Sequence, residues 1–585
     1  MPTLLDSQPT RHLFFTGKGG VGKTSLACAT GLALADAGRR VLIVSTDPAS
    51  NLDEVLGTAL GQTPTAIPDA ANLFALNIDP EAAARDYRER MVAPYRGVLP
   101  EAAIRSIEEQ FSGACTVEIA AFDEFSRLLG LPEATAEFDH VIFDTAPTGR
   151  TLRLLTLPAA WSGFIDSSSG GASCLGPLAG LEKQKALYAS TVARLADPAA
   201  TTVVLVARPD AAALREAERT RGELAALGIA NLQLIINGFF SVETTDDAIA
   251  SAFAHRATEA MQAMPAGLER LPRAVVPFLP RGTVGLEALR VVADPARAAT
   301  PTQPSSAATP LPSGLAPLVD EIARSGHGVI MTMGKGGVGK TTVAAAIAVA
   351  LAARGHTVHL STTDPAAHVA AAVGDELPGL TVGRIDPQQE VADYTAEVLA
   401  KAAPNLDAAG RALLEEDLRS PCTEEIAVFR AFAREVDRGR DGFVVLDTAP
   451  TGHTLLLLDA AEAYHREVLR TRGEMPEAVT QLLPRLRDAD YTKVLVVTLA
   501  EATPVHEAER LQADLARAGI RPFAWVIEQS LLASGTRDPL LALRGECEIP
   551  YIRSVADELA VRCALVPWRA EAPVGQVELR RLIDS

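Results

Sequence analysis

The chain has 585 residues, 48% of them apolar and 22% charged, which is typical of a soluble globular protein with more than one hydrophobic core. Its formal net charge of −19 argues against a nucleic-acid partner bound through a broad basic surface, although a local loop can still hold a nucleotide. The longest apolar runs have the length of a strand rather than the ~20 residues of a membrane helix, and the N-terminus lacks an export signal, so we expect no direct membrane insertion.

The first predicted elements surround a glycine-rich loop. A strand at His12–Phe15 runs into TGKGGVGKT at Thr16–Thr24, and an alanine-rich helix at Ser25–Ala37 and a strand at Val41–Ser45 follow. The loop satisfies the phosphate-binding pattern G-x-x-x-x-G-K-[ST], and it stands between a strand and a helix as that pattern requires. Alternating strands and helices predict a mainly parallel sheet with helices on both faces and ligands at the carboxyl ends of its strands.

This loop predicts a nucleotide site. Its glycines let successive N–H groups face phosphate oxygens, Lys23 should reach the β- and γ-phosphates, and Thr24 should ligate Mg²⁺. The residues expected to contact ATP are Gly17, Lys18, Gly19, Gly20, Val21, Gly22, Lys23, Thr24 and Ser25.

Two aspartates follow later strands of the first half. Asp47 lies in STDPAS directly after the second strand, where it is expected to position the attacking water and to belong to the Mg²⁺ site. Asp144 ends the apolar strand at His140–Phe143, as expected of a carboxylate that holds Mg²⁺. Either could instead be an ordinary turn or helix-capping aspartate, and what favours the functional interpretation is that both recur.

The whole order of motifs occurs twice. The second loop, Met333–Thr341, repeats eight of nine residues of the first, and DTAPTGHTLLLL at Asp447–Leu458 repeats ten of the twelve at Asp144–Leu155. Duplication therefore predicts two tandem P-loop domains: a first half at 1–294, a Pro/Ala/Ser/Thr-rich linker at 295–317 and a second half at 318–585. The second set of site residues is Gly334, Lys335, Gly336, Gly337, Val338, Gly339, Lys340, Thr341 and Thr342, with Asp364 and Asp447 as the equivalents of Asp47 and Asp144.

Both loops carry an extra lysine, Lys18 and Lys335, after their first glycine. This sequence resembles the deviant Walker A loop of partitioning, septum-positioning and nitrogenase iron-protein ATPases. The resemblance implies that the halves form a pseudo-dimer with ATP between them, and that each extra lysine acts catalytically on the nucleotide of the other half. It also implies that Asn237 contacts adenine. The second half reads WVIEQS there, with Glu528 and Gln529, so we expect the two sites to be inequivalent.

Three of the six cysteines suggest a ligand site. Cys115 and Cys422 begin the equivalent segments CTVEIAAF and CTEEIAVF, and Cys174 lies in a Ser/Gly-rich stretch. Thiolates are soft ligands that prefer thiophilic centres. Cys28, Cys547 and Cys563 are interpreted as ordinary core residues.

With these cysteines, the chain resembles the arsenite-translocating ATPase family over essentially its whole length. The resemblance implies that Cys115, Cys174, Cys422, Ser420 and His453 bind As(III) or Sb(III). Arg150 occupies the position equivalent to His453, and an arginine can only donate hydrogen bonds, so that position is doubtful as a ligand.

The resemblance implies an ATPase that uses ATP and Mg²⁺ to drive arsenite or antimonite efflux and is activated by the metalloid. Its expected partner is an integral-membrane pump subunit, with an arsenic metallochaperone as a candidate second partner. The expected location is the cytoplasm, at the inner face of the plasma membrane when bound to the pump. The alternative is a targeting ATPase for tail-anchored proteins, which should carry a C-x-x-C pair and a Met-rich helix; this sequence has neither. A partitioning ATPase is disfavoured by the duplication.

Overall fold

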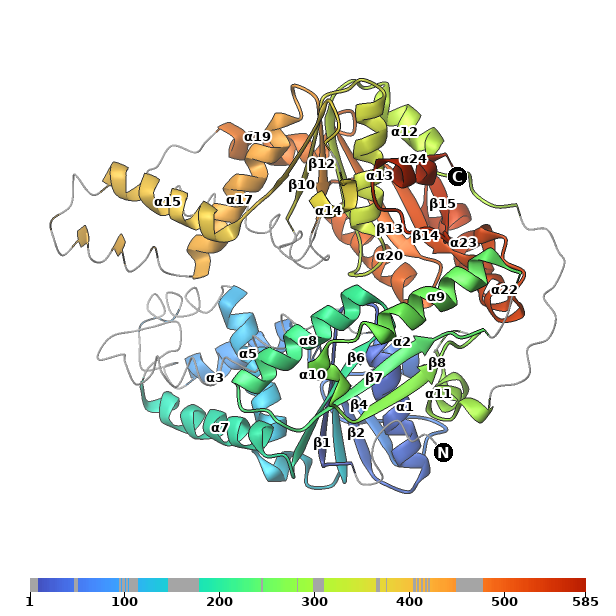
Figure 1. Cartoon of the computed structure of the whole chain (residues 1–585). Helices are drawn as coiled ribbons and strands as arrows, with labels where there is room; N and C mark the ends of the chain where they lie inside the picture. The colour runs from blue at the N-terminus through green and yellow to red at the C-terminus, as the bar shows by residue number, and fades with distance from the viewer. Residues whose placement is uncertain are drawn as a thin grey trace. The chain divides into compact units, whose positions relative to one another are not determined.

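The computed structural model divides the chain into two compact units, one of residues 1–244 and 253–302, the other of residues 245–252 and 303–585 (Figure 1). The residues that the structure describes are 9–46, 51–93, 96, 100, 104, 114–145, 178–242, 246–280, 282, 284–297, 310–363, 369–374, 376–402, 407, 410–411, 414–415, 418, 421–448 and 477–584.

The first unit is built on an eight-stranded sheet with the order β3-β4-β2-β5-β1-β6-β7-β8. All neighbouring strands pair in parallel except β3, which runs antiparallel to β4 at the edge. The predicted, mainly parallel sheet is therefore confirmed. The strands are β1 (His12–Thr16), β2 (Val41–Ser45), β3 (Thr65–Ala66), β4 (Leu73–Asn77), β5 (His140–Asp144), β6 (Thr201–Ala207), β7 (Leu232–Phe239) and β8 (Arg273–Pro277).

Helices cover this sheet. α1 packs on β1, β2 and β5, and α11 packs against α1. α5 packs between α3 and α7, and both α7 and α8 contact β6. The helices are α1 (Lys23–Asp36), α2 (Leu52–Leu56), α3 (Pro80–Val92), α5 (Ala114–Gly130), η2 (Pro132–Thr135), α7 (Leu178–Ala196), α8 (Ala211–Ala226), α9 (Ala248–Gln262), α10 (Ala266–Glu269), α11 (Leu286–Ala293) and η3 (Pro295–Arg297). The first residues of α9, up to residue 252, belong to the second unit.

The second unit repeats this topology in a seven-stranded parallel sheet with the order β11-β10-β12-β9-β13-β14-β15. Position by position, this is the first sheet without β3, as a duplication requires. The strands are β9 (Gly328–Met333), β10 (Val358–Thr362), β11 (Leu380–Arg384), β12 (Phe443–Asp447), β13 (Thr492–Leu499), β14 (Ala524–Ser530) and β15 (Cys563–Pro567).

Alternate strand residues of the second sheet enter two separate cores. Ile330 and Val445 belong to the core under α13 and α24, whereas Met331 and Leu446 belong to the core under α17 and α20. The helices are α12 (Ala316–Ala323), α13 (Lys340–Ala353), α14 (Val369–Val373), α15 (Pro387–Ala402), α17 (Pro421–Arg438), α19 (Glu477–Arg487), α20 (Ala502–Arg517), α21 (Leu531–Ser534), α22 (Pro539–Glu546), α23 (Ile549–Arg553), the π-helical turn η5 (Ser554–Leu559) and α24 (Gln576–Ile583).

The end of the predicted linker is folded. Leu315 is fully buried, the carbonyl of Ser313 accepts a 2.9 Å hydrogen bond from the N–H of Leu565, and α12 begins at Ala316. The apolar side chains of Leu315 and Leu318 give this stretch enough surface to bury, so order begins before residue 318. Residues 298–309 of the linker lie outside the described residues.

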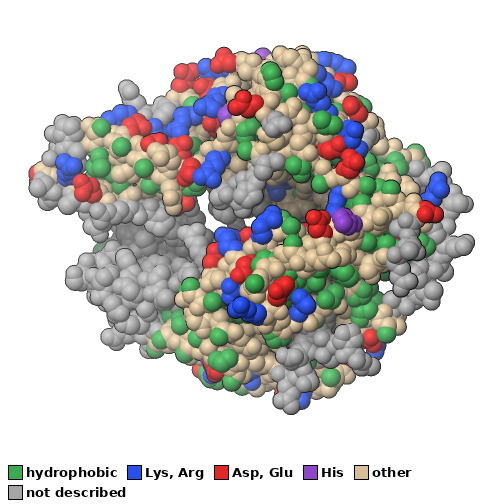
Figure 2. Space-filling view, viewed as in Figure 1, with side chains coloured by type: hydrophobic (Ala, Val, Ile, Leu, Met, Phe, Trp, Pro, Cys, Tyr) green, Lys and Arg blue, Asp and Glu red, His purple; other side chains and the backbone are tan. Residues whose placement is uncertain are grey.

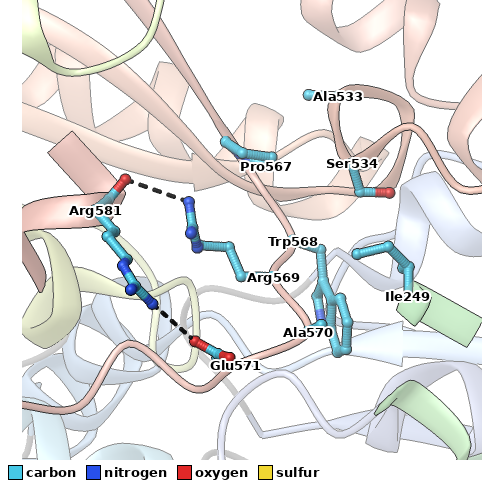
Figure 3. Close-up of a pocket in the computed structure, with 9 residues that line it drawn as sticks. All are labelled: Ile249, Ala533, Ser534, Pro567, Trp568, Arg569, Ala570, Glu571 and Arg581. Atoms are coloured by element: carbon cyan, nitrogen blue, oxygen red, sulfur yellow. Dashed lines mark hydrogen bonds and ion pairs between the residues drawn. The ribbon is translucent and has the colours of Figure 1, made fainter. Parts of the chain in front are cut away.

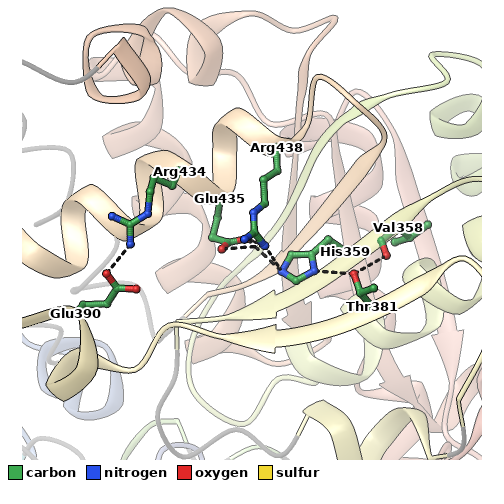
Figure 4. Close-up of polar contacts among 7 residues, drawn as sticks. All are labelled: Val358, His359, Thr381, Glu390, Arg434, Glu435 and Arg438. Atoms are coloured by element: carbon green, nitrogen blue, oxygen red, sulfur yellow. Dashed lines mark hydrogen bonds and ion pairs between the residues drawn. The ribbon is translucent and has the colours of Figure 1, made fainter. Parts of the chain in front are cut away.

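A polar cluster fixes α17 to the sheet (Figure 4). His359 of β10 contacts Glu435 and Arg438 of α17 through Nε2, both at 3.2 Å, and its Nδ1 lies 2.8 Å from the hydroxyl of Thr381 on β11. Arg434 pairs with Glu390 of α15 one turn earlier. These contacts orient the helix whose first turn contains Cys422.

On the face shown in Figure 2, basic and acidic side chains are interspersed over the described residues of each unit. Within the part of the chain that the structure describes, no helix combines the length and the apolar character needed to cross a membrane.

Residues 245–252 belong to the second unit although they precede the linker. Asp247 caps α9 there, since its Oδ1 accepts a 2.8 Å hydrogen bond from the N–H of Ala250. Its Oδ2 accepts from the hydroxyl of Thr536 at 3.0 Å, and from the N–H groups of Arg537 and Asp538. Burial raises the pKa of Asp247, but these hydrogen bonds outweigh it and lower the pKa overall.

Replacing Asp247 by alanine is expected to lower the unfolding free energy of the second unit by about 1–2 kcal/mol, because a helix cap and the acceptor for the 536–538 turn are lost together. Urea unfolding followed by the fluorescence of buried Trp525 measures the change. Asp246→Ala, at the exposed neighbouring position, is the control. An Asp247→Ala midpoint equal to that of the control would contradict this assignment.

Candidate functional site

Each phosphate loop leaves the carboxyl end of a central strand and opens a helix, as predicted. The first connects β1 to α1 and the second connects β9 to α13. A Cβ on Gly17 would lie 2.3 Å from the carbonyl oxygen of Val206, and a Cβ on Gly334 would lie 2.2 Å from that of Val497. Only glycine permits the loops to run this close to β6 and β13.

Each loop joins its helix at the glycine directly before the motif lysine, and this glycine has a left-handed backbone. Gly22 has φ 92° and Gly339 has φ 96°, and each occupies the N-cap position. Among the described residues no side chain caps the first turn of α1 or α13. The N-terminal N–H groups and the positive end of each helix dipole therefore suit an anion such as a phosphate.

The lysine of each motif folds back over its own loop. Lys23 Nζ donates to the carbonyl of Lys18 at 3.2 Å, and Lys340 Nζ donates to that of Lys335 at 3.0 Å. Both lysines are buried, with 8% and 7% of their surface exposed. Their positive charges are thus held at the loop in advance, which lowers the ordering cost of binding phosphate.

A hydroxyl and a carboxylate are paired beside each loop. Thr24 Oγ1 donates to Asp144 Oδ2 at 2.8 Å, and Thr341 Oγ1 donates to Asp447 Oδ2 at 2.7 Å. The parallel pairing of β1 with β5, and of β9 with β12, brings these residues together. Hard oxygen donors of this kind suit Mg²⁺, so the predicted magnesium residues Thr24, Asp144, Thr341 and Asp447 fit that ion.

The extra lysine of the second loop forms an ion pair in its own unit, with Glu507 of α20. Glu507 is a residue that sequence reasoning missed, because 172 positions separate it from Lys335 and no motif marks it. The action of Lys18 and Lys335 on the nucleotide of the other half stays a prediction.

Different side chains occupy equivalent places behind the two loops. Asn237, in β7, donates from Nδ2 to the carbonyl of Val21 at 2.9 Å. Glu528, in β14, is buried with 4% of its surface exposed, and burial raises its pKa to about 8 against a smaller opposing effect of its hydrogen bond with Gln529.

Other predicted site residues are placed only in part or not at all. Cys115 and Cys422 fall in the first turns of α5 and α17, but their side chains lie outside the described residues. Asp47, Arg150, Cys174, Asp364, Ser420 and His453 also lie outside them. Cys28 is fully buried in the core, as expected, whereas Cys547 and Cys563 are half-buried.

A pocket of about 490 Å³ lies in the second unit beyond the carboxyl ends of β14 and β15 (Figure 3). Trp568 and Ile249 line it, and Arg581 lies at its border, bonded to Glu571 and through its carbonyl to Arg569. None of the predicted nucleotide-contacting residues is among those that line it.

Comparisons with known proteins agree with this geometry. The family model described as "anion-transporting ATPase" matches residues 10–296 and 327–483. The chain is 53% identical to an "arsenical pump-driving ATPase" of Acidiphilium multivorum over 575 residues, and 53% identical to one of Escherichia coli over 574, with 98% of each chain covered in both. It is 30% identical to the "ATPase get3" of Schizosaccharomyces japonicus over 260 residues, which cover 40% of this chain and 77% of that protein.

Proposed function

This chain belongs to the ArsA family of anion-transporting ATPases and is an ATPase that drives an arsenical pump, and from that premise we propose how its residues serve hydrolysis and its activation. The observation that carries the proposal is the duplicated pair of a threonine hydroxyl and a strand-end aspartate beside each phosphate loop, at 2.8 and 2.7 Å.

ATP binds at both loops in this proposal. Backbone N–H groups of each loop and the helix N-terminus bind the phosphates, while Lys23 and Lys340 place a positive charge against the β- and γ-phosphates. Thr24 with Asp144, and Thr341 with Asp447, hold Mg²⁺, which neutralises charge on the phosphate oxygens when bound. Asp47 and Asp364 orient the attacking water, and Lys18 and Lys335 each act on the nucleotide bound by the other half.

The activating ligand is As(III) or Sb(III). We assign its binding to the thiols of Cys115, Cys174 and Cys422, with Ser420 and His453 as further ligands by resemblance to the family. In each half, the DTAPTG segment connects the aspartate that holds Mg²⁺ to the position of Arg150 or His453. The magnesium site and the metalloid site are therefore coupled along a short stretch of chain. Because such coupling is reciprocal, bound metalloid should raise the affinity for ATP, and bound ATP should raise the affinity for the metalloid by the same factor.

The partner in this proposal is an integral-membrane pump subunit at the inner face of the plasma membrane, and an arsenic metallochaperone is a second partner. Delivery of tail-anchored proteins is the alternative function. The arsenical pump-driving relatives match 98% of this chain, so pump driving is favoured.

Arsenite or antimonite is expected to raise ATP turnover of the wild type severalfold, and serine at Cys115, Cys174 or Cys422 should abolish that rise while leaving basal turnover intact, because a hydroxyl is a poor ligand for a thiophilic ion. Steady-state phosphate release measures it. Cys547→Ser, at a half-buried position, is the control. Unchanged turnover of the wild type with either metalloid would contradict the activation proposal.

Arg150→His should increase the number of metalloid ions bound per chain, which elemental analysis after gel filtration measures.

A further inference from the structure

The duplication puts an amide and a carboxyl group at the same place behind the two phosphate loops. A Cβ on Gly22 would lie 2.3 Å from Nδ2 of Asn237, and a Cβ on Gly339 would lie 2.7 Å from Oε2 of Glu528. Each side chain therefore lies against the glycine that turns its loop into the helix.

The backbone confirms that these positions are equivalent. The pairing of β7 with β8 is interrupted between Asn237 and Phe239, where Gly238 has φ 83°. The pairing of β14 with β15 is interrupted between Ile527 and Ser530, where Gln529 has φ 60° although it is not a glycine. An irregular stretch thus lies at the same place in both strands, directly after Asn237 in β7 and across Glu528 and Gln529 in β14, and it aims each side chain at its loop.

The two side chains differ in what they can donate. The amide of Asn237 gives one N–H to the carbonyl of Val21, and the carbonyl equivalent to this one in the second loop is that of Val338. An ionised carboxylate has no proton to give and would repel a carbonyl. Oε2 of Glu528 accepts no hydrogen bond among the described residues, which is costly for a buried charge, whereas a protonated carboxyl can satisfy its polar group by donating.

We propose that Glu528 is a positioning residue of the second phosphate loop, where its protonated carboxyl donates to the carbonyl of Val338 as the amide of Asn237 donates to that of Val21. Loss of this proton loosens the turn at Gly339 and weakens nucleotide binding at the second loop, while the first loop, held by an amide, is unaffected. The inference rests on the proposed binding of ATP at both loops.

The neighbouring charges are engaged elsewhere. On β13 the residue opposite Glu528 is Leu499. Lys340 Nζ faces the carbonyl of Lys335, whose own side chain pairs with Glu507. The carboxylate of Glu548 accepts from the hydroxyl of Ser530 and from the N–H groups that follow it, and Arg544 pairs with Glu501.

The direction of the pH effect follows from burial. Burial raises the pKa of Glu528 from 4.5 to about 8, so the folded chain takes up a proton there that the unfolded chain lacks above pH 4.5. The contribution of Glu528 to stability is therefore complete below about pH 4.5 and is lost as the pH rises to about 8. The nucleotide affinity of the second loop should decline at and above the upper end of this window.

The test measures Mg-ATP binding by the full chain with the first loop disabled by Lys23→Ala, using calorimetry between pH 7 and 9. If only the protonated form binds well, the dissociation constant should rise about tenfold over this range. Glu528→Gln supplies a permanent N–H donor, so it should bind within about threefold of the parent at pH 7 and remove the excess slope. The matched control is Lys340→Ala, which leaves the first loop to report the ionisation of ATP itself.

A slope that survives in Glu528→Gln, or equal slopes for the two loops, would overturn the inference alone. So would loss of binding by a Glu528→Gln chain whose urea unfolding midpoint is unchanged, because it would show that the carboxylate is needed. A parent that binds no Mg-ATP at any pH would overturn both the inference and the proposed function.

Discussion

Asparagine at both Asp144 and Asp447 is expected to lower ATP turnover by about 10²–10³-fold, because each change removes the charge that holds Mg²⁺ while keeping the shape of the side chain. The two aspartates are almost fully buried, with 1% of their surface exposed, and each accepts the hydroxyl of its motif threonine. An asparagine oxygen can still accept that hydrogen bond, so the loop should keep its structure.

Steady-state turnover at saturating Mg-ATP measures this effect, and a magnesium titration shows whether the apparent magnesium affinity falls with it. Asp197→Asn, at an exposed position outside the site between α7 and β6, is the control for the change from Asp to Asn. The single variants Asp144→Asn and Asp447→Asn then show how much each loop contributes to ATP turnover. A double variant that retains more than about a tenth of the wild-type rate would rule out the proposed role of both carboxylates.

Alanine at Lys23 or at Lys340 is expected to weaken ATP binding at the altered loop about 10²-fold, since a buried, charge-assisted contact to phosphate is worth about 2–5 kcal/mol. The reason lies in the resting geometry: each lysine already bonds the carbonyl of the residue after the first glycine, at 3.2 and 3.0 Å, and so faces the place where phosphate binds.

Calorimetry on each single variant should show one tight site remaining, and the double variant should show neither. Lys401→Ala is the control, because Lys401 forms a surface pair with Glu397 on α15 and its side chain is 75% exposed. Arginine at Lys340 should not restore binding, because a planar guanidinium does not replace the compact ammonium at this turn. Two tight sites in Lys340→Ala would contradict the assignment.

Much of the fold could be predicted because its signals are local and repeated. The strand Val41–Ser45 was predicted to the residue, and both phosphate loops stand between a strand and a helix as their pattern requires. By contrast, β3 has only two residues and no apolar alternation, so nothing in its composition marks it. The folded end of the linker was missed because Leu315 is one apolar residue among prolines and serines, and its burial depends on a core formed by distant strands.

The site likewise contains residues that the sequence predicts and contacts that it does not. Gly339 and Lys340 were found because a motif fixes their chemistry, and Glu528 was singled out because the duplication aligned it with Asn237. The bond between Lys335 and Glu507 could not be predicted, since it depends on how α20 packs on its sheet. That Oε2 of Glu528 lies against Gly339 also depends on tertiary structure, because a bulge in β14 directs it there.

Because residues 245–252 belong to the second unit, a cut at the linker does not separate the two units cleanly. A cut at the linker would leave Asp247 on the N-terminal fragment and its partners Thr536, Arg537 and Asp538 on the C-terminal fragment. Each product would lose part of its fold: the first would carry a frayed start to α9, and the second an unsupported turn before α22. Residues 245–252 of the first half thus complete the second unit, so a fragment that carries the whole second unit must include them.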